Sequence, residues 1–146
     1  MGRDECLGCR TAAGEFAADE VYRDDRVVAV VAHRAVNPGH LVVVTREHVR
    51  NALSMEDEAL AHLMRVGRDL ARGLLAALPT PGVMLVLNNE SPCQTLFHTH
   101  LHVIPRAPGD AMDYSFGCDV GPAERAEMAA RLRPALATLG NAARRG

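Results

Sequence analysis

Residues 97–105 read FHTHLHVIP, which places a histidine at positions 98, 100 and 102. In an extended strand, side chains two residues apart point to the same face, about 6.5–7 Å from one another. The three imidazoles would then share one face, and the mostly apolar residues between them would share the other. A buried imidazole needs a hydrogen-bond partner, so three aligned histidines make a poor hydrophobic core. Because imidazole can act as a nucleophile, a proton carrier or a metal ligand near neutral pH, this stretch predicts a chemical site.

The same stretch has two other interpretations. The histidines could form the solvated face of an edge strand. They could also be three ligands of one zinc ion whose fourth ligand is water, an arrangement found in catalytic zinc sites. The sequence around the histidines argues against a plain metal site of that kind.

The flanking residues resemble the signature of the histidine triad (HIT) proteins, His-φ-His-φ-His-φ-φ with φ apolar, preceded by Gln and Ser or Thr. Gln94 and Thr95 occupy these preceding positions, and Thr99 is a mild departure at the first φ. Two upstream motifs follow the family's order. Residues 38–44, PGHLVVV, resemble its second characteristic strand, and residues 6–9, CLGC, resemble the Cys-x-x-Cys start of its zinc-containing branch.

The composition narrows the class of protein. A chain of 146 residues is long enough for one domain with its own core. Its formal net charge of −2 and its 3% of aromatic residues give no indication of a nucleic-acid partner. No apolar run approaches the roughly 20 residues of a membrane span, and the N-terminus lacks the apolar core of a secretory signal. We therefore expect a cytoplasmic protein with no membrane partner, whose four cysteines serve metal or thiol roles rather than disulfides.

Hydrophobic patterning predicts an α+β fold. Apolar runs indicate buried strands, and the Asp24-Asp25 pair indicates a hairpin turn. Apolar residues at helical spacing predict a long amphipathic helix that starts at Ser54, and a C-terminal helix kinked or broken at Pro134. The predicted strands are 20–23, 27–32, 41–45, 83–87 and the histidine strand, and the predicted helices are 54–78 and 122–139. We expect antiparallel strands with the long helix packed on one face.

The resemblance implies one HIT-like domain over residues 1–146. Within it, residues 1–15 would be a zinc-binding N-terminal segment and residues 107–146 a C-terminal extension. The resemblance also implies a homodimer, which pairs through the long helix and the neighbouring sheet edge.

The resemblance assigns the catalytic roles. The middle histidine, His100, would be the nucleophile that accepts a nucleotidyl group, and the third, His102, would face the phosphate. Splitting one displacement into two easier steps is the logic of covalent catalysis, and phosphoryl transfer of this kind needs no catalytic metal.

Other polar residues match positions near the phosphate. In the family, the positions of Gln94 and Thr95 contact the phosphate or the bridging oxygen, and the histidine matching His40 lies beside the active site. Asn88 and Asn89 both resemble an asparagine at the start of the loop. The loop is one residue shorter here, so which of the two corresponds is open.

Cys6 and Cys9 have the spacing of zinc ligands. A redox pair has the same spacing, but no βα unit of the thioredoxin kind precedes it. The resemblance to the zinc-containing branch adds His48 and His98 as the other two ligands. Two cysteines and two histidines form a closed structural site, so we expect one structural zinc per chain that does not activate water.

The leading prediction is a HIT-type hydrolase or nucleotidyl transferase. It would act on nucleoside phosphoramidates or dinucleoside polyphosphates through a covalent nucleotidyl-histidine intermediate. The alternative is a non-catalytic nucleotide-binding or scaffold protein of the same family. Ala32 motivates this alternative, because the family has an acidic residue there that holds the ribose hydroxyls. The sequence does not indicate the base or the leaving group.

Overall fold

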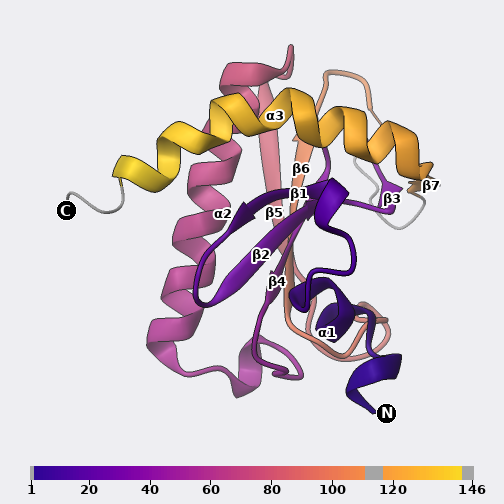
Figure 1. Cartoon of the computed structure of the whole chain (residues 1–146), viewed down its shortest axis with the longest axis vertical. Helices are drawn as coiled ribbons and strands as arrows, with labels where there is room; N and C mark the ends of the chain where they lie inside the picture. The colour runs from indigo at the N-terminus through magenta and orange to yellow at the C-terminus, as the bar shows by residue number, and fades with distance from the viewer. Residues whose placement is uncertain (1, 111–116, 143–146) are drawn as a thin grey trace.

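The computed structural model describes residues 2–110 and 117–142 and shows an α+β fold (Figure 1). The strands are β1 (Glu20–Arg23), β2 (Val27–Val31), β3 (Arg34–Ala35), β4 (Leu41–Thr45), β5 (Gly82–Leu87), β6 (His100–Arg106) and β7 (Cys118–Asp119). The α-helices are α1 (Leu7–Ala12), α2 (Asp57–Ala77) and α3 (Pro122–Ala142), and the 3-10 turns are η1 (Arg3–Glu5), η2 (Ala17–Asp19) and η3 (Ala52–Ser54).

The main sheet has five strands in the order β1-β2-β4-β6-β5, and each neighbouring pair is antiparallel. The β1–β2 hairpin turns as predicted at Asp24, whose carboxylate accepts the backbone N–H groups of Arg26 (2.8 Å) and Val27 (2.9 Å). A second, two-stranded sheet pairs β3 with β7. The antiparallel sheet, the long helix and the C-terminal helix confirm the predicted α+β class.

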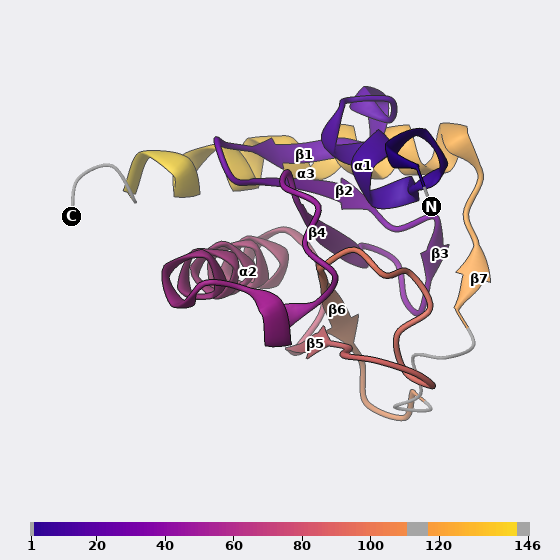
Figure 2. The same ribbon diagram turned by 90° about the horizontal axis from the view of Figure 1, so that it is seen from below.

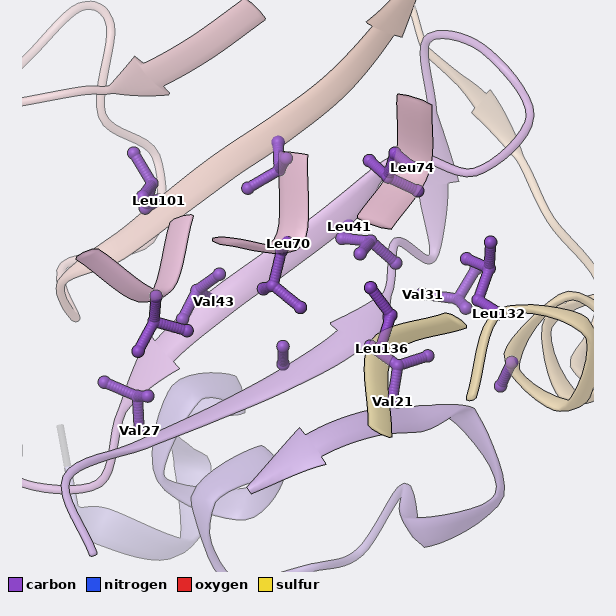
Figure 3. Packing of buried hydrophobic residues seen from close by; sticks show 14 of the residues in the cluster. Val21, Val27, Val31, Leu41, Val43, Leu70, Leu74, Leu101, Leu132 and Leu136 are labelled. Atoms are coloured by element: carbon purple, nitrogen blue, oxygen red, sulfur yellow. The ribbon is translucent and has the colours of Figure 1, made fainter. Parts of the chain in front are cut away.

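The hydrophobic core lies between one face of the sheet and the helices α2 and α3, which contact each other. In Figure 2, α3 runs behind β1 and β2, and α2 lies beside β4. Alternate residues of β2, β4 and β6 point into it, among them Leu101 of β6, while α2 contributes Leu70 and α3 contributes Leu136 (Figure 3). The fully buried core side chains include Leu41, Val43, Leu63, Leu74, Val103 and Leu132. Burial of this face forces the intervening residues of β6 onto the other face of the sheet.

The structure corrects some predicted boundaries. The long helix begins at Asp57 rather than at Ser54, because Ser54 belongs to η3 and the backbone of Met55 and Glu56 is extended. Strand β6 begins at His100, so His98 lies just before the strand instead of within it. Pro134 lies inside α3 and does not end it.

Helix α3 belongs to the core, so its packing should carry stability. We expect Leu132→Ala to lower the free energy of unfolding by about 2–5 kcal/mol, since Leu132 is completely buried. Urea unfolding followed by circular dichroism measures the change. The control is Leu53→Ala, whose side chain is 75% exposed and should alter stability by less than about 0.5 kcal/mol. Equal effects of the two substitutions would contradict the packing.

Candidate active site and metal centre

The sheet face opposite the core carries two groups of histidines. Strand register sets His100 beside Val44 and His102 beside Val42 of β4, with Val86 of β5 on the other side of His102. The rings of His100 and His102 are 4.9 Å apart between centroids. The ring of His98 turns away from these two and meets His48, with centroids 4.9 Å apart. The three aligned histidines of the sequence therefore serve two separate centres.

The first centre brings together Cys6, Cys9, His48 and His98, whose ligand atoms all lie within 4.8 Å of one another. Each cysteine Sγ lies 3.3–3.7 Å from the Nδ1 atoms of the two histidines, and these Nδ1 atoms are 3.1 Å apart. A tetrahedral zinc with sulfur at 2.3 Å and nitrogen at 2.0–2.1 Å would separate its ligand atoms by about 3.3–3.8 Å. The donor set and its spacing therefore fit a zinc ion.

The hydrogen bond made by the second ring nitrogen of His98 also fits a zinc ion at this centre. Nε2–H of His98 donates to the carbonyl of Thr45 at 2.7 Å, which leaves a lone pair on Nδ1, the atom that faces the cysteines. Metal-bound histidines usually have such an outer partner, which fixes the tautomer and orients the ring. His98 is completely buried, whereas His48 is exposed.

Helix α1 packs tightly against the ring of His98. A Cβ on Gly8 would lie 2.4 Å from Cγ of His98, so only glycine lets the backbone between the two cysteines approach the ring. Cys6 precedes α1 and Cys9 lies within it. Helix α1 and the residue before it thus place both thiols next to His98.

The second centre contains His100, a residue that is 8% exposed. Its Nδ1–H donates to the carbonyl of His98 at 2.7 Å. This bond leaves the lone pair on Nε2, and burial lowers the pKa of His100 below its ordinary value. His100 is therefore a neutral imidazole with one nitrogen available as a nucleophile.

His102 and His40 form a directed chain of hydrogen bonds. Nδ1 of His40 accepts the backbone N–H of Val36 (3.1 Å), so its Nε2–H donates to Nδ1 of His102 (2.9 Å). The proton of the neutral His102 ring must then sit on Nε2. Burial lowers the pKa of His40 to about 4 and that of His102 to about 3. At neutral pH the chain therefore offers the Nε2–H of His102 as a donor.

Gln94 lies in the loop before the triad and is 2% exposed. Its Nε2 donates to the carbonyls of Arg50 (2.7 Å) and Leu96 (3.0 Å). Its Oε1 accepts the backbone N–H of Glu90 (2.9 Å) and the side-chain amide of Asn51 (3.2 Å). The whole amide is used within the chain, so Gln94 braces the loop in this structure.

The two asparagines at the start of the loop differ in their surroundings. Asn89 accepts the N–H of Ala52 (2.9 Å) and donates to the carbonyl of Leu87 (3.1 Å), which ties the loop to η3. Asn88 directly follows β5, whose last residue, Leu87, pairs with Leu101 of the core. Continued alternation of the strand would place Asn88 on the same face as His100 and His102. The side chain of Thr95 is exposed.

Sequence reasoning missed an ion pair beside this loop. The guanidinium of Arg50 makes two 2.8 Å bonds to the carboxylate of Glu90 and lies 4.2 Å from the ring centroid of Phe97. Glu90 has a φ of 62°, a conformation that is uncommon outside glycine. Arg50 and Asn51 hold it there, since Asn51 also donates to its carboxylate at 2.6 Å. Forty positions separate Arg50 from Glu90, and no local pattern connects them.

Ala32 and the remaining histidines lie outside both centres. Ala32 is 2% exposed, and its N–H donates to the carbonyl of His40 at 2.9 Å. His33 contacts Asp19 at 3.4 Å. His62 contacts Asp24 at 2.7 Å. Within residues 2–110 and 117–142, no helix has the length and apolar character needed to cross a membrane.

The neutral His100, with its proton fixed on one nitrogen, lies next to a cluster of two cysteines and two histidines that could hold a metal ion, on an antiparallel sheet. Together these features define a site of the histidine triad class. The HIT domain model matches residues 13–109, and the chain therefore belongs to the HIT family. A zinc-bound histidine triad family protein from Mycobacterium smegmatis is similar, with a TM-score of 0.82 and 30% identity over 97% of this chain and 99% of that one.

Further comparisons agree with the family. A HIT-like protein from Mesomycoplasma hyorhinis is 38% identical over 92 residues, which cover 62% of this chain and 83% of that protein. A hypothetical histidine triad nucleotide-binding protein from Sulfolobus tokodaii has the same fold, with a TM-score of 0.81 at 24% identity over 92% of this chain and 93% of that one.

The buried His40–His102 pair predicts a pH dependence of stability. Both pKa values lie below the ordinary 6.5 in the folded chain, so the unfolded chain binds more protons as pH falls below 6.5. Stability should therefore be full above pH 6.5 and fall towards pH 4, by about 2 kcal/mol per imidazole at pH 5. Urea unfolding at pH 7.5, 6 and 5 tests this.

The comparison variant for this prediction is His40→Gln, whose amide can still accept from Val36 and donate to His102. Its unfolding free energy should fall less between pH 7.5 and pH 5 than that of the unmodified chain. Because both proteins keep the same metal ligands, any loss of metal in acid cancels in the difference. If the unfolding free energies of the two proteins fell equally with pH, His40 would not contribute to the pH dependence of stability.

Proposed function

We propose that this chain is a HIT-type hydrolase or nucleotidyl transferase that acts on nucleoside phosphoramidates or dinucleoside polyphosphates. The observation that supports it most is the bond from Nδ1–H of His100 to the carbonyl of His98, which leaves Nε2 of a neutral imidazole free to attack. The name of the Sulfolobus tokodaii relative, a nucleotide-binding protein, agrees with such a substrate. Cysteines placed as metal ligands agree with a reducing, cytoplasmic setting.

The proposed reaction has two displacements at phosphorus. Nε2 of His100 attacks the phosphorus next to the nucleoside, and the bond to the leaving group breaks with its electron pair on the amine or polyphosphate. An amine leaving group takes its proton from water. A second water then attacks, the N–P bond breaks with its electron pair returning to Nε2, and the proton of that water passes to solvent. For a transferase, another acceptor hydroxyl or phosphate replaces this water.

Neighbouring groups stabilise the charge of the transition state. The Nε2–H of His102 donates to a phosphate oxygen, and His40 sets the direction of that donor. Asn88 and Thr95 are the further phosphate contacts that we propose, because continued strand alternation would place one on the histidine face and the hydroxyl of the other is exposed. We assign Gln94 the task of holding the loop in shape, since its amide is fully bonded within the chain.

We further propose that Cys6, Cys9, His48 and His98 hold one structural zinc per chain. When bound, it fastens the N-terminal segment to the catalytic strand, and four protein ligands leave no position for a reactive water. The zinc-bound Mycobacterium smegmatis relative supports the choice of metal. A zinc held by the three triad histidines does not fit, because His100 and His102 do not belong to the ligand cluster.

We propose a homodimer formed at the β5 edge of the sheet. Strand β5 is the last strand in the sheet order, and every one of its residues is half-buried. The neighbouring helix α2 exposes Met64 and Leu75. Pairing two copies of β5 about a twofold axis would bond the edge and cover these side chains.

The dimer predicts that a charge on α2 separates the subunits. Leu75→Glu should weaken association at least about tenfold, because a carboxylate would be buried among apolar groups. Light scattering over a micromolar dilution series measures the molecular mass. Ala137→Glu, an exposed position on α3, is the control and should leave the mass unchanged. A single-chain mass for the unmodified protein would exclude the dimer.

The alternative is a nucleotide-binding or scaffold protein of the family without turnover. Ala32 favours it, because a buried methyl group offers no acceptor to a ribose diol. Turnover of a panel of nucleoside phosphoramidates and polyphosphates, followed by product analysis, separates the two functions. Nucleotide binding without any product would favour the alternative.

The nucleophile is tested by His100→Asn, since the ring is buried and an alanine would leave a cavity. The asparagine amide can still donate to the carbonyl of His98, so the fold should persist. Turnover should fall at least about a thousandfold, because no nitrogen nucleophile remains. His62→Gln, far from the cluster, should keep normal turnover. Near-normal turnover of His100→Asn would assign the nucleophile elsewhere.

A further inference from the structure

His98 takes part in both centres through different atoms. Its Nδ1 faces the two cysteines at 3.4 and 3.6 Å, and its backbone carbonyl accepts Nδ1–H of His100 at 2.7 Å. The first contact belongs to the metal centre, and the second selects the tautomer of the proposed nucleophile. A rotation of the peptide unit between His98 and Thr99 would therefore break this bond, and Nε2 of His100 would no longer be fixed as the nitrogen with the lone pair.

The peptide unit between His98 and Thr99 is also held at its N–H end, by a residue next to His48. The unit that carries the carbonyl of His98 carries the N–H of Thr99, which donates to the carbonyl of Val49 at 2.7 Å. The hydroxyl of Thr99 donates to the same carbonyl at 2.9 Å. Val49 directly follows His48, so each end of the peptide is held by the segment of a metal ligand.

Without a cation, repulsion between their lone pairs would drive the ligand atoms of this centre apart. The Nδ1 atoms of His48 and His98 are 3.1 Å from each other, and the Nε2–H of His98 is already given to Thr45. Lone pairs that converge at such distances repel one another unless a proton or a cation lies between them, and one proton joins only two of the four ligand atoms. Their separation would shift the segments of Val49 and Thr99 relative to each other.

The centre is open to solvent on one side. Cys9 and His48 line a cavity of about 540 Å³, together with Arg10 and Arg46, whereas Cys6 and His98 are buried. An ion could enter and leave through the cavity without unfolding of the buried half. The metal can then exchange while the sheet stays intact.

We propose that metal bound by Cys6, Cys9, His48 and His98 controls the tautomer of His100, so that turnover follows zinc occupancy although the metal never contacts the substrate. His98 is the positioning residue that connects the two centres. This inference rests on the proposed function of His100 as the nucleophile. It gives the zinc a regulatory role beyond fastening the N-terminal segment.

The test uses the full chain labelled with ¹⁵N-histidine at pH 7.5. Zinc is removed with a chelator and then restored in stoichiometric amount, and zinc content, the ring ¹⁵N signals of His100, kcat and KM are measured in each state. Metal removal should shift the His100 signals away from the Nδ1–H tautomer. It should lower kcat at least about tenfold with little change in KM, as expected for a wrong tautomer, and zinc should reverse both effects.

Two variants show whether the loss of metal, rather than another effect of the chelator, changes the His100 signals. Cys9→Ser should show the metal-free His100 signals even with zinc added. Cys118→Ser, an exposed thiol in β7, is the matched control and should behave as the unmodified chain. Identical His100 signals with and without metal in the folded protein would overturn the inference.

A second measurement applies if the metal-free chain unfolds. Cadmium takes the same thiolate and imidazole ligands at longer bonds, so the folded cadmium form should show shifted His100 signals and a lower kcat. Equal signals and equal kcat in the zinc and cadmium forms would contradict the inference. The ring signals need no substrate, so a chain that turns over no nucleoside phosphate would contradict the proposed function alone.

Discussion

The two-residue alternation of β6 is the constraint on which the rest of the structure depends. Leu101 and Val103 are buried between the sheet and α2, so His100 and His102 can only emerge on the opposite face. A shift of the strand by one residue would place imidazoles in the core and leucine in the site. Packing of the core therefore fixes the face on which His100 and His102 lie.

Polar contacts then fix the chemistry of each ring, and most of these contacts come from the backbone. Backbone groups decide which nitrogen of each histidine carries its proton. The carbonyl of Thr45 does so for His98, the carbonyl of His98 for His100, and the N–H of Val36 for His40. Backbone groups move only when their strand or turn moves, so the tautomers share the rigidity of the sheet. Burial keeps the rings neutral, and hydrogen bonds decide for each of these chemically identical side chains whether the nitrogen that faces its centre carries a lone pair or a proton.

Local patterning could predict the strands, because the buried runs 27–31 and 41–45 are unbroken in the sequence. It could not predict that the helix begins at Asp57, since Ser54 satisfies the same rules but lies in a separate turn. The family resemblance, and not spacing alone, predicted that His48 and His98 would lie with Cys6 and Cys9 in one cluster. The distant pairs of Gln94 with Asn51 and of His62 with Asp24 depend on three-dimensional packing and left no local signal.

The five consecutive buried residues of β2 have a consequence for handling the protein. A strand buried along its whole length needs cover on both faces. Helix α3 contacts β2 from the core, and α1 also contacts β2 and β4. Proteolytic loss of the first dozen residues would remove two thiols and uncover a valine-rich strand in the same event. A clipped chain would therefore expose an apolar patch on the face of the sheet, and its solubility would report the integrity of the N-terminus.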